Sequence, residues 1–388
     1  MATSKNNGEL VLVFDIGSSS VGGALFYMGK KDIPKIVFSM REPIPTEEEL
    51  DIDRFLFLTL IALKLVAETI CMKGYGAPKR IFCILSSPWY ASQVRLVKLE
   101  KETPFIFTNK LADELIQKEI IMAEEEYLAK NERTENKVRP IELKNMQTVL
   151  NGYAISSPLN QKAKLLEMNI FISMSGEQIL TKIEESIQQH FHGPTIKFSS
   201  FMMASFTVAR DVFVNQDNFL LINIGGEVTD IAMIKKDVLK ESVSYPAGSN
   251  FIVRSIANEL KCSIDEAKSY VSLYKEGHIE ANILKKIDPI MMKLKTQWLK
   301  KFQESLSNIT NDISIPATIF ITVDPELADF FSDIIKTEEF NQYSLIESKF
   351  RVFFLSTQAL HGIVVFGSDT KRDVFLIIEA IYINHFLS

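Results

Sequence analysis

The sequence predicts an α/β protein of two lobes that repeat one strand hairpin, with a small α+β unit inserted into the first half. Two observations carry this prediction. A buried strand, a turn of small residues and a returning strand occur at Glu9 to Tyr27 and again at Asn218 to Ile234. Between Ser86 and Lys164 the composition changes, and this segment is expected to contain charged strands and a helix rich in Glu and Lys. Because one unit occurs twice, we expect an internal duplication.

Composition excludes several classes of protein. A chain of 388 residues is long enough for two to three compact units, and its 46% hydrophobic and 24% charged residues are typical of a folded globular protein. Its net charge of −6 gives no basic surface for nucleic acid, so we expect no nucleic-acid partner. Its three cysteines are scattered among apolar neighbours, which predicts reduced core residues in a cytoplasmic protein.

The chain carries no segment that predicts export or a membrane span. Its first ten residues are polar and do not resemble a signal peptide. The apolar run Phe55 to Leu63 is interrupted by Lys64 and Glu68, short of the ~20 residues that a span needs. We therefore predict a buried helix there and no transmembrane segment.

The remaining elements of the first half follow from capping residues and apolar runs. Asp51 or Asp53 can cap a helix that runs to about Met72. Ser175 and Gln178 fit a capping box that opens a helix to about Phe191. Strands are expected at Ile36 to Met40, Lys79 to Leu85, Val94 to Leu99, Val149 to Ile155 and Leu166 to Ser173, with a helix at Asn109 to Lys130.

The second half is expected to be richer in helix. Ser263 and Glu266 form a second capping box. Helices are expected at Ser249 to Leu260, about Pro289 to Asn308 and Val374 to Phe386, with a strand at Ala317 to Val323. The last helix is apolar on too many sides for a membrane-surface helix, which favours a core helix and leaves membrane contact open.

These elements divide the chain into three units. Residues 1–85 and 166–215 form the first lobe, residues 86–165 the inserted unit, and residues 216–388 the second lobe with a helical subdomain. Both hairpin turns would then face a cleft between the lobes.

The two turns carry the chemistry of a phosphate site. Successive backbone amides in a Gly-rich and Ser-rich turn can converge on an anionic oxygen, an arrangement called a nest. The first turn offers Gly17, Ser18, Ser19 and Ser20, and Asp15 beside it can hold a magnesium ion through waters. The second turn offers Gly225, Gly226 and Thr229. Two facing nests would hold the phosphates of a nucleotide.

Both turns resemble a known family. Asp15-Ile16-Gly17-Ser18-Ser19-Ser20 is similar to the first phosphate motif of the actin-like superfamily, and the segment from Asn223 to Ala232 is similar to the second. The resemblance implies an actin-like (ribonuclease H-like) fold with ATP and Mg²⁺ as cofactors. It places Asp15 and Asn223 at the metal, and Asp15 among the catalytic residues.

The order of the intervening segments resembles one branch of that superfamily, the division protein FtsA and the pilus-assembly protein PilM. Thr103 to Tyr127 resembles the helix of their inserted subdomain, of the SHS2 type, and Leu150 to Leu159 resembles the strand and turn that follow it. Tyr245 to Ser249 is similar to a Pro-x-Gly turn, which adds Gly248 to the cofactor-binding residues. The resemblance covers residues 9 to about 325.

Several residues depart from the family pattern. Asn223 stands where aspartate is usual, and a neutral amide is a poorer metal ligand, so at most a weak ATPase is expected. The glycines of the adenosine motif are replaced by Val323-Asp324-Pro325. Glu227 replaces a small residue of the second phosphate motif, where it could narrow the pocket or act as a substitute acid.

Two further segments carry candidate site residues. Gln93 lies in the connection where the family carries its water-orienting residue, so it is the second catalytic candidate, although a solvated loop glutamine fits equally well. His190 and His192 alternate as metal ligands would, but no acidic or cysteine partner lies near them in sequence.

The resemblance implies an FtsA-like, ATP-binding scaffold or filament-forming adaptor in bacterial cell division, in the cytoplasm or at the inner face of the membrane. Its partner would be a tubulin-like division protein. The alternative is a PilM-like scaffold for type IV pilus or secretion assembly that binds the peptide tail of an inner-membrane protein. A third alternative is a family member that no longer binds nucleotide. A sugar kinase or activator ATPase would need a catalytic aspartate near the second hairpin or a substrate-binding lobe, and neither is visible in the sequence.

Overall fold

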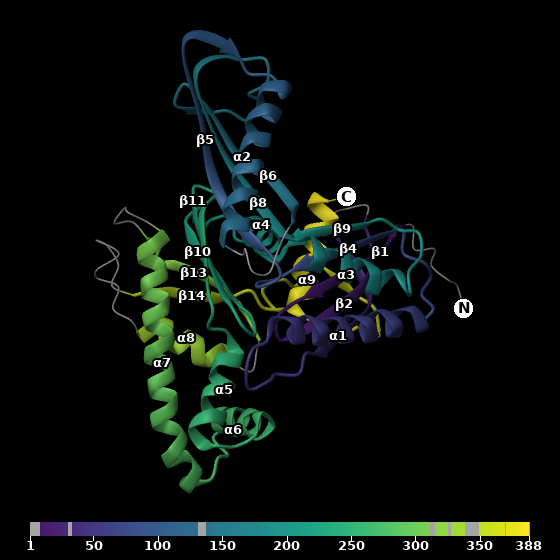
Figure 1. Ribbon diagram of the computed structural model, residues 1–388, viewed down its shortest axis with the longest axis vertical. Helices are drawn as coiled ribbons and strands as arrows, with labels where there is room; N and C mark the ends of the chain where they lie inside the picture. The colour runs from purple at the N-terminus through teal and green to yellow at the C-terminus, as the bar shows by residue number, and fades with distance from the viewer. Residues whose placement is uncertain are drawn as a thin grey trace.

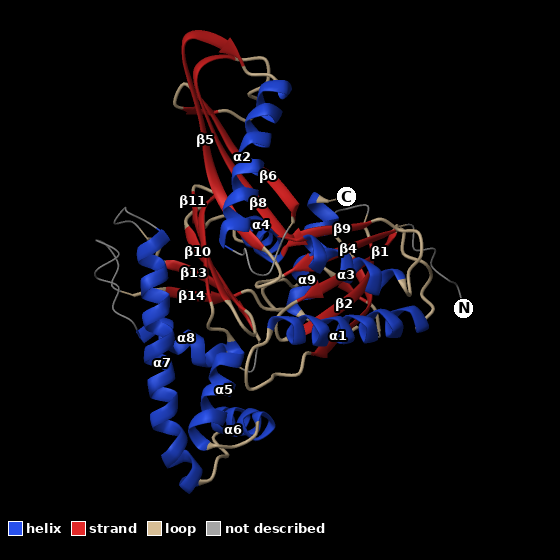
Figure 2. Cartoon of the chain, viewed as in Figure 1, coloured by secondary structure: helices blue, strands red, loops and turns tan. Residues whose placement is uncertain are grey.

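A computed structural model describes residues 8–29, 33–130, 137–309, 315–324, 327–337, 349–368 and 370–387. Two sheets side by side form the body, and a third sheet with one helix projects from it (Figure 1). Figure 2 shows that most helices lie around the two body sheets, whereas the projecting unit is mainly strand.

The first sheet has the strand order β15-β3-β2-β1-β4-β9. Its strands are β1 (Leu10–Ile16), β2 (Ser20–Tyr27), β3 (Lys35–Pro43), β4 (Arg80–Leu85), β9 (Ile196–Ser200) and β15 (Val365–Phe366). β1 pairs with β2 antiparallel and with β4 parallel. The expected first hairpin is confirmed.

The second sheet repeats this arrangement in the order β12-β11-β10-β13-β14. Its strands are β10 (Phe219–Ile224), β11 (Thr229–Lys235), β12 (Val238–Tyr245), β13 (Thr318–Val323) and β14 (Arg351–Phe354). β10 pairs with β11 antiparallel and with β13 parallel, as β1 does with β2 and β4. The internal duplication that the sequence predicts is therefore present.

Helices cover both faces of the first sheet. A Cβ atom added to Gly23 would meet Val66 and Ile70 of α1 (Ile52–Met72), whereas one added to Gly22 would meet Leu376 of α9 (Val374–Phe386). Neighbouring strand residues point to opposite faces, so α1 and α9 lie on opposite sides of the sheet. α3 (Glu177–Gln188) packs beside α1, and α4 (Phe201–Val212) packs beside α9.

α1 is more exposed than the sequence suggested. Asp51 caps it, as expected, by accepting a hydrogen bond from the amide of Arg54 at 2.8 Å. The helix is long and apolar enough to cross a membrane, contrary to expectation, but half of it is buried inside the fold. Phe57, Ile61 and Leu65 lie on its outer face and are each at least 42% exposed.

The C-terminal residues return to the first lobe. β15 pairs with β3, and α9 packs against β1 and β2, so these residues lie with the first lobe, whereas the sequence-based division assigned them to the second. The apolar residues of α9 belong to the same core as those of α1. Chain order alone does not reveal this return. The second lobe instead contains α5 (Ser249–Leu260), α6 (Ile264–Glu276), α7 (Ala281–Ile309) and α8 (Ala328–Thr337).

The third sheet has the order β5-β8-β6-β7 and carries α2 (Asn109–Lys130). Its strands are β5 (Ala91–Ile106), β6 (Val138–Leu150), β7 (Tyr153–Ala154) and β8 (Lys162–Gly176). β8 pairs with β5 and β6 from one end to the other, so the expected boundary at residues 165 and 166 falls inside a strand. The inserted unit is therefore continuous with the first lobe through a strand.

Some local expectations were right and others wrong. Ser263 and Glu266 form the predicted capping box of α6. α3 instead has Gly176 as its N-cap, without a side-chain hydrogen bond, so the expected cap at Ser175 is wrong. The Ser175 hydroxyl donates to the carbonyl of Trp89 at 2.6 Å, a partner that local sequence cannot reveal. Cys83 is buried, but Cys71 is exposed rather than in the core.

Candidate functional site

The first turn joins β1 to β2 and is held by its own backbone. The amide of Gly17 donates to the carbonyl of Ser20 at 3.1 Å, and the carbonyl of Gly17 accepts from the indole nitrogen of Trp89 at 2.9 Å. The carbonyl of Ser19 accepts from the amide of Ile44 at 2.8 Å. The turn is therefore fixed from two sides by the residues that follow β3 and β4.

The second turn joins β10 to β11 and lies against the start of α5. The carbonyls of Gly225 and Gly226 accept from the amides of Ser249 and Asn250 at 2.9 and 2.8 Å. A Cβ atom on Gly248 would lie 2.2 Å from the carbonyl oxygen of Gly225, so only glycine fits there. The first amides of α5, which could otherwise bind an anion, are therefore used inside the protein.

The two turns touch each other. The amide of Glu227 donates to the hydroxyl oxygen of Ser18 at 3.0 Å, in a buried contact. A Cβ atom on Gly226 would lie 2.7 Å from the carbonyl group of Ser18. The structure thus brings the predicted phosphate-binding residues of both lobes together. The amide of Glu227, which could otherwise bind a phosphate oxygen, is bonded to the first turn instead.

The side chain of Glu227 is buried beside the second turn. Arg254 of α5 donates to both carboxylate oxygens, at 2.6 and 2.8 Å, and Asn250 donates to one of them at 2.7 Å. A two-pronged arginine contact of this kind is the geometry with which proteins hold carboxylates and phosphates. Glu227 therefore fills an anion site on its own turn.

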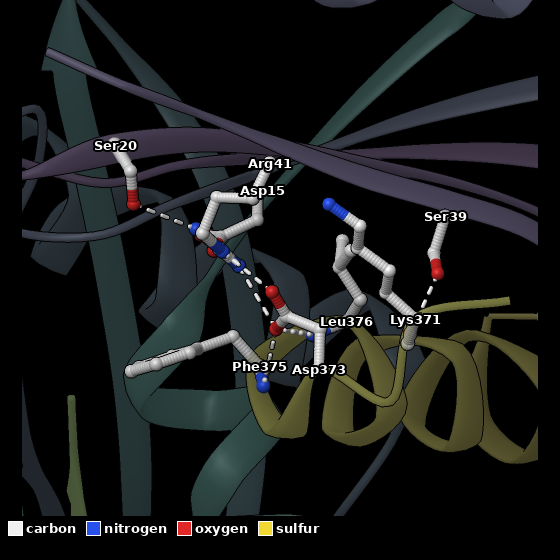
Figure 3. Close-up of polar contacts among 8 residues, drawn as sticks. All are labelled: Asp15, Ser20, Ser39, Arg41, Lys371, Asp373, Phe375 and Leu376. Atoms are coloured by element: carbon white, nitrogen blue, oxygen red, sulfur yellow. Dashed lines mark hydrogen bonds and ion pairs between the residues drawn. The ribbon is translucent and has the colours of Figure 1, made fainter. Parts of the chain in front are cut away.

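Asp15, the expected metal ligand, is paired with an arginine (Figure 3). Arg41 on β3 donates to Asp15 at 2.6 Å, to Asp373 at 2.5 Å and to the hydroxyl of Ser20 at 3.0 Å. Asp373 caps α9 by accepting from the amides of Phe375 and Leu376. The guanidinium thus links the first hairpin to the C-terminal helix.

Charge and burial act against each other in this cluster. Burial raises the pKa of Asp15, although Arg41 opposes the shift. Burial would also raise the pKa of Asp373, but Arg41 and the helix amides outweigh it and leave that pKa lowered. Burial, reinforced by Asp15, raises the pKa of Glu379 on α9 well above its usual range. Glu379 therefore keeps its proton to a higher pH than an ordinary glutamate does.

The side chain of Asn223 is hydrogen-bonded to α4. Its amide donates to the hydroxyl of Ser205 at 3.1 Å, and its side chain is buried. Thr229 is turned away in a similar manner, because its hydroxyl donates to the carbonyl of Ala247 at 2.7 Å. The hydroxyl of Thr229 is thereby turned away from a bound phosphate, whereas the Oδ1 atom of Asn223 is buried and accepts no hydrogen bond among the described residues.

Asp230 lies beside these residues and bridges the lobes. Its Oδ1 atom accepts from Ser87 of the first lobe at 2.8 Å and from Ser244 of β12 at 2.5 Å. Burial raises the pKa of Asp230 to about 6, and the two hydroxyls limit the shift. The sequence did not single this residue out.

The structure places Gln93 with the inserted unit. It lies on β5 and accepts from Arg95 at 2.9 Å, while Arg95 forms ion pairs with Glu119 and Glu126 of α2. The structure therefore does not bring Gln93 to the two turns. Among the residues that the structure describes, no group of three or more His, Cys, Asp or Glu is placed to hold a metal ion, and this covers His190 and His192.

Two cavities lie near the turns. One of about 270 Å³ is lined by Ser19, Thr46, Asn250, Lys268 and Asp324, among others. The other, of about 470 Å³, is lined by Arg41, Asp324, Phe354 and Asp373, among others. Ligand pockets usually measure about 300 to 1,000 Å³. Neither of these cavities is lined by Ser18, Gly225 or Gly226.

This arrangement does not fit a magnesium nucleotide held between the turns. The turns are in contact, Arg41 occupies one oxygen of Asp15, and Glu227 fills the anion site of the second turn. Val323 and Asp324 stand where the family carries glycines, and Pro325 lies outside the described residues. The residues around the two turns therefore do not fit the expected ATP and Mg²⁺.

Sequence reasoning missed Arg41, Asp373, Glu379 and Arg254. One signal was present, because Glu379 is the lone acid in the apolar run Val374 to Ile383. An acid in a helix that is apolar on all sides must be buried, and such a group needs a partner. Arg41 and Arg254 carry no comparable signal, since their partners lie far away in the sequence.

A separate groove of about 600 Å³ runs between the lobes and the inserted unit. Its walls are mainly apolar and come from the start of α1, the connection after β4, and helices α2, α3 and α5. They include Leu50, Ile52, Trp89, Tyr127, Ile179 and Phe251.

Comparisons with known proteins support the fold. No family model matches the chain, and no curated protein matches it in sequence. A solved structure titled as the PilM–PilN type IV pilus biogenesis complex is 13% identical, covers 96% of both chains and has a TM-score of 0.61. The ethanolamine utilization protein EutJ from Carboxydothermus hydrogenoformans is 10% identical, covers 96% of this chain and 89% of its own, and has a TM-score of 0.44. Given the duplicated hairpin sheets and this similarity, the chain has the fold of the actin-like ATPases.

Proposed function

We propose that this protein is a PilM-like scaffold that binds a short apolar peptide segment of an inner-membrane assembly protein. The observation that carries the proposal is the groove of about 600 Å³ between the lobes and the inserted unit. Its volume lies within the range of about 300 to 1,000 Å³ that is usual for binding pockets.

The groove opens onto exposed apolar residues. Leu50 and Ile52, at its α1 edge, are 49% and 59% exposed. A second exposed apolar group, Phe57, Ile61 and Leu65, lies on the other side of α1, where a spacing of four residues keeps its members together. Exposed apolar residues at the edge of the groove favour an interaction site there.

The polar floor of the groove would fix the orientation of a bound peptide. Glu227 and Arg254 line it and are bonded to each other. The side chain of Arg254 is 16% exposed, so it can still meet a backbone carbonyl or an acidic side chain of the partner. Apolar walls with a few fixed polar groups are what peptide recognition requires.

Similarity of fold favours pilus or secretion assembly. The structure that matches over 96% of both chains is titled as a complex of PilM with PilN, and we infer a comparable partner here. We place the protein in the cytoplasm at the inner face of the membrane, where the tail of such a partner would be. α9 is buried in the first lobe, so it is not available as the membrane-binding helix of an FtsA-like adaptor.

A photo-crosslinking residue at Ile52 tests the partner. In cells, we expect it to trap the cytoplasmic tail of an inner-membrane protein, identified by mass spectrometry. The matched control is the same residue at Met292 of α7, which is 70% exposed but remote from the groove in the chain and not part of its lining. Capture of a tubulin-like division protein at Ile52 would favour the FtsA-like function instead.

Affinity for the crosslinked segment then tests the groove. A synthetic peptide of that segment should bind the wild-type protein, and Ile52→Asp should weaken binding at least tenfold because it places a charge on the apolar wall. Met292→Asp should bind as the wild type does. Equal affinity in all three proteins would place the peptide elsewhere.

A further inference from the structure

We propose that side chains of the protein itself occupy the positions of a metal ion and a phosphate in the cleft between the lobes. Arg41 stands in for a metal ion beside Asp15, and Glu227 stands in for a phosphate on the second turn. The lobes would then be held closed without any nucleotide. This inference does not depend on which partner the groove binds, although Glu227 and Arg254 also line the groove.

The first step concerns the cation. Asp15 and Asp373 offer two carboxylates to one point, which is what a hard divalent ion needs. That point is taken by the guanidinium of Arg41, at 2.6 Å from one carboxylate and 2.5 Å from the other. Arg41 carries one positive charge where the ion would carry two, and the carboxyl group of Glu379 also lies against Asp15.

The second step concerns the anion. Arg254 and Asn250 make three hydrogen bonds to the carboxylate of Glu227, at distances from 2.6 to 2.8 Å. These donors form a site for a tetrahedral or planar anion. Glu227 follows Gly226 directly, so the anion is carried by the turn that would otherwise receive it.

The third step links this anion to closure. The residues that hold Glu227 also reach the first lobe. Arg254 donates to the carbonyl of Glu47 at 2.7 Å, and Asn250 contacts the hydroxyl of Thr46 at 3.2 Å. The amide of Glu227 itself donates to Ser18. One carboxylate therefore orients three contacts between the lobes, the task that a bound phosphate performs in switch proteins.

The wild-type protein gives the first test. We expect the Tm to be unchanged by millimolar Mg²⁺, ATP or both, and calorimetric titration with magnesium ATP to show no binding. Micromolar binding of magnesium ATP, or a marked rise in Tm, would overturn the proposal, because the nucleotide would then find room that the internal ligands are proposed to fill.

Arg41→Ala tests the cation. It leaves two buried carboxylates facing each other, and we expect the Tm to fall by about 5 to 10 °C. Millimolar Mg²⁺ should restore much of the loss in this variant alone. The control is Arg80→Ala, which removes an ion pair to Glu9 and should not respond to Mg²⁺. The side chain of Arg80 is 25% exposed and that of Arg41 is 24% exposed, so the two substitutions are comparable. If Arg41→Ala is recovered unfolded, refolding with and without Mg²⁺ makes the same comparison. The proposal is contradicted if Mg²⁺ makes no difference to this variant.

Glu227→Ala tests the anion. We expect amide hydrogen exchange to rise at Ser18 to Ser20 and at the start of α5, and acetate or phosphate to reverse the increase. The control is Glu184→Ala, which breaks an ion pair with Arg139 outside the cleft and should leave exchange at both turns unchanged. Unchanged exchange in Glu227→Ala, or exchange that no anion reverses, would show that this carboxylate does not hold the lobes together.

Discussion

At the scale of single residues, Asp230 couples the contact between the lobes to pH. It accepts from Ser87 of the first lobe and Ser244 of the second, and the phenol groups of Tyr90 and Tyr245 also face it. Its pKa is about 6 in the folded protein against an ordinary value of 3.8. The proton is therefore held more tightly when the protein is folded.

The stabilising effect of that proton is present below the unfolded pKa of 3.8 and is lost as the pH rises through about 6. The difference corresponds to about 3 kcal/mol. Asp230→Asn keeps an acceptor for both serines and cannot titrate, so we expect its free energy of unfolding to lack this decline. Urea unfolding across about pH 4 to 8 measures the effect.

The partly exposed Asp211, which pairs with Arg210, supplies a control for this experiment. Asp211→Asn should keep the pH dependence of the wild type. If Asp230→Asn also kept it, another group would have to be responsible for the decline.

At the scale of elements, α9 shows how a local signal and a tertiary contact combine. Asp373 caps the helix, and the residues that follow are apolar on all sides, which predicts burial. Glu379 interrupts this pattern, and its carboxyl group is hydrogen-bonded to Asp15. The helix therefore carries one buried acid that faces the cluster around Asp15.

Glu379→Gln is expected to stabilise the protein above neutral pH. The raised pKa of Glu379 means that its contribution is present below the ordinary pKa of 4.5 and declines as the pH rises. Glutamine has a similar shape, carries no charge and can donate to Asp15, so we expect a gain of about 1 to 3 kcal/mol at alkaline pH and little at acidic pH. Chemical denaturation at both ends of the range measures it, and a loss of stability at alkaline pH would contradict it.

At the scale of the whole molecule, Glu142 ties the inserted unit to the first lobe. It lies on β6 and is buried, and it accepts from Tyr382 of α9 and from Ser200, the N-cap of α4. Three segments distant in sequence thus meet at one carboxylate. We infer that the orientation of the inserted unit depends on this contact.

Tyr382→Phe should therefore destabilise the whole protein. Removal of the hydroxyl leaves one oxygen of the buried carboxylate without its donor, at a cost of about 1 to 3 kcal/mol. Thermal unfolding measures this loss, and Tyr153→Phe serves as the control because Tyr153 is 73% exposed on β7. Equal Tm values for the two variants would mean that the contact does not support the fold.

The sequence by itself determined the repeated hairpins, the helix at Asn109–Lys130 and the box at Ser263, and it narrowed the cap of α1 to Asp51 or Asp53. These features depend on contacts between residues close in the chain, which a pattern of apolar, small and capping residues can specify. The residues of both turns were also found from sequence, because a tight turn needs glycine and hydroxyl side chains locally.

Tertiary structure alone decided what those turns contact. Arg41 meets Asp373 across 332 positions of the chain, and the amide of Glu227 meets Ser18 across 209. The return of α9 to the first sheet brings the first pair together, and the contact between the lobes brings the second. Sequence patterns specify whether a side chain is buried or exposed, whereas the identity of a distant partner depends on how the lobes pack. In this protein, that packing places the protein's own charged side chains in the expected cofactor site.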